Sequence, residues 1–96
     1  MNLIKLKNWG IVVGFCNFIK PELLKGNNYY LQGNVYGNSK FSDGTSILTT
    51  AIKDIVDAEE YKKIYTQNTI YYVYEKDVSE DCEKEYPSYF KRLSIK

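Results

Sequence analysis

The segment 69–74, TIYYVY, constrains the fold more than any other part of the chain, because all six residues are β-branched or aromatic. Such residues favour extended strands. The segment 61–66 precedes it, and the two are separated only by Gln67 and Asn68, so together they predict a β-hairpin. Since side chains alternate along a strand, Tyr72 and Tyr74 are expected on one face with Ile70, and Tyr71 with Val73 on the other.

Other short apolar segments predict further strands. Residues 3–7 alternate apolar and polar, 11–15 form an apolar run, and 29–37 are rich in tyrosine, with an expected bulge or bend at Gly33 and a turn at Gly37. Pro21 starts a predicted helical turn over 21–26, and Pro87 starts a predicted helix over 87–93 that follows an acidic connection. Trp9, between the first two strands, is expected to anchor the core.

The stretch 45–56 fits two structures. Leu48, Ala51, Ile52, Ile55 and Val56 recur at helical spacing, but most of the stretch is β-branched, which favours a strand. With either outcome we predict a mainly β (α+β) fold, a small, partly open barrel or twisted antiparallel sheet of five to six strands with a short C-terminal helix. The 96 residues are expected to form a single domain, 1–96.

The composition argues against most enzyme classes. Histidine is absent, which removes the most common side chain for proton transfer near neutral pH and the most common nitrogen ligand of transition metals. Cys16 and Cys82 match neither a C-x-x-C pair nor a zinc pattern, and two reduced thiols are favoured over a disulfide. The acids at 80–85 lack the spacing of a calcium loop. We therefore expect no catalytic residues, no metal site and no cofactor.

The remaining features of the sequence limit location and partners. No apolar run is long enough to span a bilayer and no secretory signal is visible, so we expect a cytoplasmic protein with no membrane association. The net charge is +1, with basic residues concentrated early and acidic residues late. Because Arg92 is the only arginine, sequence-specific DNA binding is not expected.

Several motifs in a fixed order resemble those of a known family. The pieces are KNW at 7–9, GNVYG at 33–37, FSDGTSI at 41–47, TTAI at 49–52 and PSY at 87–89. This order resembles a family of small, mostly uncharacterised proteins of phages and prophages in low-GC Gram-positive bacteria, with K-N-W, G-x-V-Y-G and F-x-D-G-T motifs. The resemblance implies a strand after D-G-T, although the acidic connection at 57–60 is longer here, and it implies a phage accessory role such as counter-defence.

Tyrosine is the residue type that most needs a functional explanation. The chain has ten Tyr and four Phe. Because the tyrosine hydroxyl needs a polar partner, tyrosine is common at partly solvated surfaces and at interfaces. The rings could simply cover the sheet, or they could stack on bases or form a protein interface. Glycines and asparagines near 33–38 could line an anion cradle or merely form turns. The candidate binding residues are Tyr29, Asn34, Tyr36, Asn38, Lys40, Tyr72 and Tyr74.

These expectations combine into a non-enzymatic binding protein. We predict a phage or prophage protein, expected to be a homo-oligomer, that binds a host defence protein through its Tyr-rich surface. The alternative is a sponge that holds a small anionic nucleotide signal between subunits, which is less favoured because one Arg and dispersed Lys make a poor phosphate cage. A small enzyme working without histidine is the remaining alternative.

Overall fold

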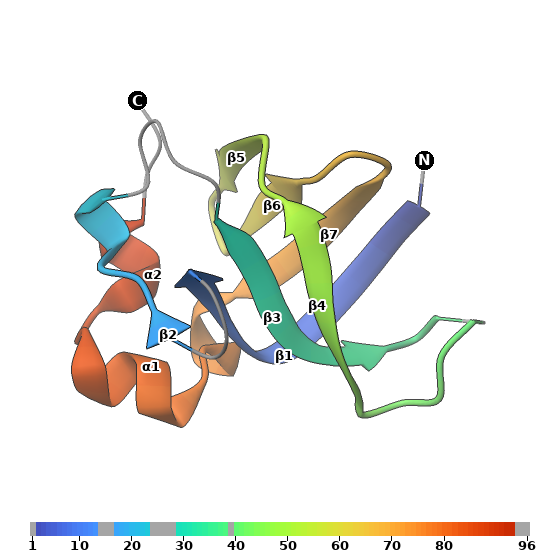
Figure 1. Ribbon diagram of the computed structural model, residues 1–96, viewed down its shortest axis with the longest axis horizontal. Coiled ribbons are helices and arrows are strands. Elements are labelled where there is room, and N and C mark those ends of the chain that lie inside the picture. The colour runs from blue at the N-terminus through green and yellow to red at the C-terminus, as the bar shows by residue number, and fades with distance from the viewer. Residues whose placement is uncertain (1, 14–16, 24–28, 39, 94–96) are drawn as a thin grey trace.

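A computed structural model describes residues 2–13, 17–23, 29–38 and 40–93 (Figure 1). Seven described strands form one sheet in the order β4-β3-β1-β7-β6-β5, and the short β2 pairs with the far end of β1. The strands are β1 Asn2–Val13, β2 Asn17–Phe18, β3 Tyr30–Tyr36, β4 Thr45–Ala51, β5 Asp54–Ala58, β6 Tyr61–Tyr65 and β7 Thr69–Tyr74. The helical elements are η1 Pro21–Leu23, η2 Glu75–Asp77, α1 Glu80–Glu85 and α2 Tyr89–Arg92. The predicted mainly β class with a short C-terminal helix is confirmed, but the sheet has seven described strands where five to six were predicted, and its β1–β7 pair is parallel.

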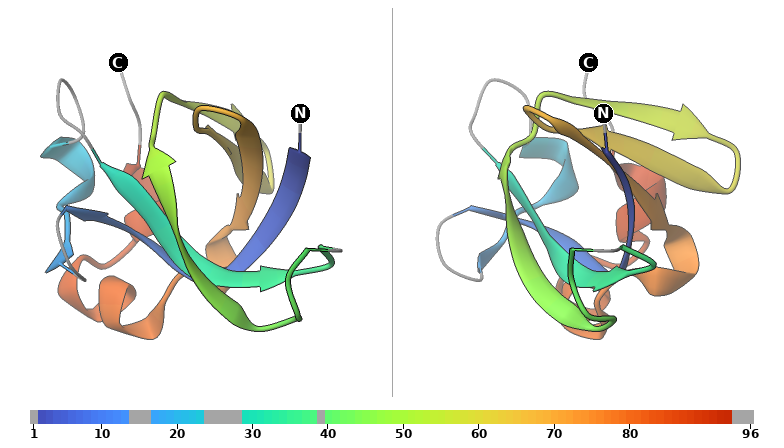
Figure 2. Two further views of the ribbon diagram at one scale, coloured as in Figure 1. Left: turned by 45° about the vertical axis from the view of Figure 1, so that its right-hand side comes forward. Right: turned by 90° about the vertical axis from the view of Figure 1, so that its right-hand side faces the viewer.

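The sheet curls into a partly open barrel (Figure 2). The strands β4 and β5 are joined by only two residues, yet they pair with β3 and β6 at opposite ends of the strand order. At this corner the Ile52 N–H donates to the Tyr29 carbonyl (2.8 Å) and the Lys53 N–H donates to the Tyr65 carbonyl (2.7 Å). The two edges of the sheet therefore meet at one end of the barrel.

The strand β1 is one continuous strand from Asn2 to Val13, which corrects the prediction of separate strands at 3–7 and 11–15. Asn8 adopts a positive φ of 52°, which its short polar side chain tolerates. The pairing with β3 shifts between Lys7 and Gly10, so Asn8 and Trp9 form a bulge and the strand continues beyond it. Residues 14 and 15 of the second predicted strand lie outside the described residues, as does Cys16. Pairing of β1 with β7 is parallel, unlike the other described strand pairs.

The predicted bend at Gly33 is wrong in its position. Gly33 lies in regular β3 and the bulge is on the opposite strand, β1. A Cβ at Gly33 would lie 3.1 Å from the Lys7 carbonyl oxygen and 3.2 Å from the Trp9 Cβ, so the glycine lets the two strands approach at the bulge. The predicted turn at Gly37 is confirmed by its positive φ of 72°.

The stretch 45–56 is extended, and the helical alternative is wrong. It is divided at Ile52 and Lys53 between β4 and β5, because the chain changes from one edge of the sheet to the other at this point. The hairpin of β6 and β7 and the helix within 87–93 are confirmed. Of the predicted turn over 21–26, η1 confirms the start, and 24–26 lie outside the described residues.

The acidic segment after β7 is helical, which corrects its prediction as a plain connection. It contains η2 and α1. In α1 the buried residue Cys82 packs toward the core, while the acids of that helix are exposed. Trp9 is fully buried, as predicted, and its ring meets Tyr89 and Phe90 of α2 edge-on at 6.2 and 6.3 Å. The interior of the barrel is therefore continuous with the helical end of the molecule. No helix among the described residues is long and apolar enough to span a bilayer.

Candidate functional site

The outward side of β7 carries the tyrosines that the sequence pattern placed there. Tyr71 and Val73 are buried at 7% and 0% exposure, whereas Ile70, Tyr72 and Tyr74 are half-buried on the opposite face. This confirms the alternation predicted from the sequence. The rings of Tyr72 and Tyr74 therefore lie outside the barrel.

The pairing of neighbouring strands extends this surface. Tyr61 and Tyr65 of β6 face the same side as Lys63, and the Tyr61 ring lies 5.4 Å from that of Tyr72 and 5.5 Å from that of Tyr74. On the other side of β7, Lys5 of β1 pairs with both Tyr72 and Tyr36. We call this surface the Tyr–Lys face. It consists of Lys5, Lys7, Tyr36, Tyr61, Lys63, Tyr65, Tyr72 and Tyr74.

Two lysines of this face lie over aromatic rings. The Lys5 Nζ lies 4.9 Å from the centre of the Tyr74 ring and the Lys7 Nζ lies 5.1 Å from that of Tyr36. In the described part of the chain the ion pairs are Lys62–Asp57, Lys91–Glu75 and Arg92–Glu22, and none of them involves the face.

The acid nearest to the face in register is Asp54 of β5. It is exposed and pairs with Tyr65, and its carboxylate accepts a hydrogen bond from the Ile55 N–H (2.9 Å). At the other end of the face, Glu59, Glu60 and Glu75 line a hollow together with Tyr74. The Tyr–Lys face therefore combines lysines with aromatic rings, and carboxylates border it.

The predicted site residues are only partly brought together. Tyr36, Tyr72 and Tyr74 lie on the Tyr–Lys face, whereas Tyr29 is 5% exposed and belongs to the core. Burial there means that the Tyr29 ring is not displayed to a partner.

Asn38 and Lys40 lie in the connection between β3 and β4. The Lys40 N–H donates to the Asn38 side-chain oxygen (2.7 Å) and the Gly37 N–H donates to Asp43 (3.0 Å). Because these amides are satisfied within the connection, they favour a turn over the anion cradle considered from the sequence.

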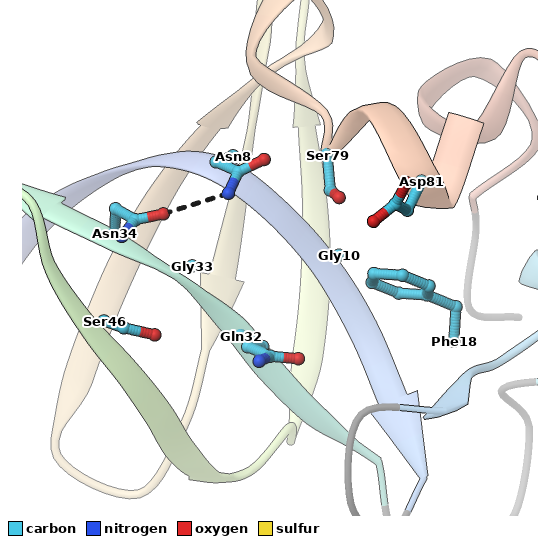
Figure 3. Close-up of a pocket in the computed structure, with 9 residues that line it drawn as sticks. All are labelled: Asn8, Gly10, Phe18, Gln32, Gly33, Asn34, Ser46, Ser79 and Asp81. Carbon is cyan, nitrogen blue, oxygen red and sulfur yellow. Dashed lines mark hydrogen bonds between the residues drawn. The ribbon is translucent and has the colours of Figure 1, made fainter. Parts of the chain in front are cut away.

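The remaining candidate, Asn34, lines a pocket of about 270 Å³ beside the Tyr–Lys face (Figure 3). Asn34 pairs across strands with Lys7, so the pocket and the face adjoin. The backbone at Gly10 and Gly33 forms the floor, and the Phe18 ring forms one wall. A Cβ at Gly10 would lie only 2.4 Å from this ring, so the ring packs directly on the glycine. The other lining residues are polar: Asn8, Gln32, Asn34, Ser46, Ser79 and Asp81.

Sequence reasoning missed several of these residues. Lys5 and Lys7 alternate with Ile4 and Leu6, and this pattern alone could have placed both lysines outside. Tyr61 could have been found from the hairpin register, because an antiparallel hairpin brings it opposite Tyr74. The pocket had no comparable signal, since it depends on the β1 bulge and on α1.

The buried titratable groups do not suggest a nucleophile. Burial raises the pKa of the Cys82 thiol to about 12, with smaller contributions from Glu83 and Glu85. Within the described residues, no group of three or more His, Cys, Asp or Glu side chains is placed to hold a metal ion.

Comparison with known proteins gives no assignment: no protein-family model, no curated protein and no solved structure matches the chain. The resemblance to phage and prophage proteins therefore stays a prediction from the motifs.

Proposed function

We propose that this chain is a non-enzymatic binding protein whose Tyr–Lys face takes an anionic, aromatic ligand, namely a nucleotide. The observation that carries the proposal is that Lys5, Lys7 and Lys63, none of them in an ion pair in the described part of the chain, alternate with tyrosine rings on one open sheet face. Rings can stack on bases while the ammonium groups meet phosphates. The lysines that are dispersed in the sequence become neighbours through strand pairing, which answers the objection that they make a poor phosphate cage.

The free energies of the contacts favour replacing the cation–π contacts within the face by contacts to a ligand. A cation–π contact at an exposed site contributes about 0.5–1 kcal/mol, whereas a base stacked on an aromatic side chain contributes about 1–3 kcal/mol. A nucleotide that displaces Lys5 from the Tyr74 ring gains the stacking and then meets the freed ammonium group with its phosphate. The net change is favourable for a ligand that brings both groups.

The biological role that fits this proposal is phage counter-defence. The motif order implies a phage or prophage accessory protein, and a small protein that binds nucleotides without turning them over would sequester a host nucleotide signal in the cytoplasm. This role rests on analogy and on the Tyr–Lys face together.

A second candidate is binding of a host defence protein, which a different observation favours. Leu48 on β4 and Val56 on β5 are 54% and 41% exposed, and both lie on edge strands of the sheet. Exposed edges of this kind pair with strands of other chains, so they suit a protein partner or a homo-oligomer. In this case Leu48→Lys would abolish the complex and leave nucleotide binding unchanged.

The test is a titration of the purified chain with mononucleotides and with an oligothymidylate of six nucleotides. Fluorescence and the melting temperature serve as the two readouts of binding. Binding should raise the melting temperature by several degrees at saturating ligand. Tyr72→Leu should weaken binding about tenfold while Tyr72→Phe, which keeps the ring, should not. Lys5→Ala, which removes a lysine of the face, should also weaken binding. Lys84→Ala is its control, because Lys84 is an exposed lysine on α1, away from the face. No binding of any nucleotide would overturn the proposal.

A further inference from the structure

The polar pocket beside the Tyr–Lys face has a chemistry of its own. Among the described residues that line it, Asp81 is the only ionisable one, so these residues bring a carboxylate and no cation to the pocket. A phosphate group would be repelled there, whereas a ligand with N–H donors would be attracted. The pocket and the face are thus suited to opposite ends of one nucleotide.

Hydrogen bonds fix which atom Asn8 presents to the pocket. The Asn34 Nδ2 donates to the Gly44 carbonyl (2.9 Å), and because a carbonyl only accepts, this sets the orientation of the Asn34 amide. Its Oδ1 then accepts from the Asn8 Nδ2 (3.2 Å). Asn8 is left with its Oδ1, an acceptor, directed away from Asn34 and toward the side of the pocket where Ser79 lies (Figure 3).

Further acceptors lie on that same side. The side-chain oxygens of Ser79 and Asp81, at the start of α1, face the pocket near the Asn8 oxygen (Figure 3). Ser79 is held in place because its N–H donates to the Trp9 carbonyl (2.7 Å) at the β1 bulge. Phe18 supplies a ring next to these acceptors. The pocket therefore combines an acceptor-rich edge with an aromatic wall.

We propose that this pocket takes one guanine base, with the adjacent N1–H and N2–H₂ donors of the base directed at Asp81 and its neighbouring oxygens. An ionised carboxylate has two acceptor oxygens and suits two parallel N–H donors. Adenine and cytosine offer a single amino group on that edge, and uracil a single N–H. A volume of about 270 Å³ is slightly below the range of roughly 300–1,000 Å³ for small-molecule pockets, which suits one base and not a dinucleotide.

When guanine occupies the pocket, the phosphate of that nucleotide is directed to the lysines of the Tyr–Lys face. The tyrosine rings then stack on a second base of a strand, or on any base that does not enter the pocket. Lys7 pairs with Asn34 across the strands, so its ammonium group is the cation closest in register to the pocket. This inference rests on the proposed nucleotide binding and adds base preference to it. The guanine could come from a free nucleotide or from a base within a single strand.

The experiment compares GMP with IMP, AMP, CMP and UMP by NMR titration of the isotope-labelled chain. IMP lacks only the N2 amino group, so it isolates that donor. We expect GMP to bind about tenfold or more tightly than IMP and to shift the amide signals of Asn8, Ser79 and Asp81. A six-residue oligothymidylate with one central guanine, measured beside GMP, distinguishes a strand from a free nucleotide as the source.

Asp81→Asn is the decisive variant because it keeps the shape of the side chain and removes the charge. It should abolish the GMP preference while leaving AMP binding unchanged. Glu85→Gln, which removes a carboxylate from the same helix outside the pocket, is the matched control and should retain the preference. Thermal melting of both variants checks that each is folded.

The outcomes separate this inference from the proposed function. Equal affinity for all bases, with signals shifted only on the Tyr–Lys face, would overturn the guanine pocket and leave the proposed function intact. Absence of binding to every nucleotide and strand would overturn both. A GMP preference lost in Asp81→Asn but unaffected by Tyr72→Leu would support the pocket and contradict the role of the face.

Discussion

Trp9 of β1 contacts both the end of β7 and the helix α2. Its indole N–H donates to the Tyr74 carbonyl (2.9 Å), and its ring contacts Tyr89 and Phe90 of α2. The side chain is completely buried even though it belongs to a bulge, because the bulge turns it inward beneath the helix. One residue thus fixes the position of α2 relative to β1.

We predict that Trp9→Ala lowers the free energy of unfolding by about 3–5 kcal/mol, the usual cost of removing a buried aromatic side chain. The Tyr74 carbonyl would also lose its donor. Urea denaturation followed by circular dichroism measures the change, with Phe41→Ala at a 40% exposed position as the control. A loss below about 1 kcal/mol would contradict the anchoring role.

The buried thiol and phenol predict instability at alkaline pH. Burial raises the pKa of Cys82 from 9.0 to about 12 and also raises the pKa of Tyr89 above its ordinary value of 10.0. Above about pH 9 the unfolded chain releases these protons while the folded chain keeps them, so the free energy of unfolding falls as the pH rises. Well below pH 9, where both groups stay protonated in the folded and in the unfolded chain, they add no pH dependence.

Urea midpoints measured from pH 7 to pH 10.5 should therefore decline above pH 9, and Cys82→Ala should make the decline shallower. In the folded chain Cys82 should also resist iodoacetamide at pH 8, as followed by mass spectrometry of its peptide. Rapid labelling under native conditions would show that the thiol is accessible.

At the scale of elements, strands with a strong local pattern were predictable and interruptions were not. The hairpin of β6 and β7 follows from residue types and from the Gln67-Asn68 turn. The division of 45–56 into β4 and β5 depends on which distant strands, β3 and β6, pair with each half, and no local pattern contains that information. The β1 bulge likewise depends on Gly33 of another strand.

The same distinction applies to the candidate site. Alternation placed Tyr72 and Tyr74 on one outward face, but the pattern of Tyr29 is equally compatible with an outward ring, and tertiary packing buries it. Asp81 belongs to an acidic segment without the spacing of a metal loop and is exposed, yet α1 brings it into the lining of the pocket. Residues whose role depends on contacts distant in sequence were therefore missed.

The corner between β4 and β5 is the element whose loss would open the barrel. We predict that Lys53→Pro destabilises the fold by about 1–3 kcal/mol, because it removes the N–H that donates to the Tyr65 carbonyl. Lys53→Ala keeps this donor and should change the stability by less than about 0.5 kcal/mol. Thermal and urea unfolding compare the two variants. Equal stabilities would mean that the corner does not hold the edges together.

At the scale of the whole molecule, charge is separated between two regions. The lysines of the Tyr–Lys face come from β1 and β6, whereas the exposed acids Glu80, Asp81, Glu83 and Glu85 are gathered on α1. The asymmetry along the sequence is thus retained in space, with Asp81 at the border between the two. An anionic ligand is attracted to one region and repelled by the other, which orients it before contact.

This separation predicts how binding responds to salt. Each phosphate neutralised on a single strand contributes a slope of about −0.7 to a plot of log K against log salt concentration, so three lysines give a slope of about −2 for an oligothymidylate. Lys5→Ala should reduce the slope by about 0.7, whereas Lys84→Ala should not change it. An apolar protein interface at Leu48 and Val56 would instead bind with little dependence on salt. A slope near zero that is unaffected by Lys5→Ala would therefore exclude phosphate binding by the face and favour the protein partner.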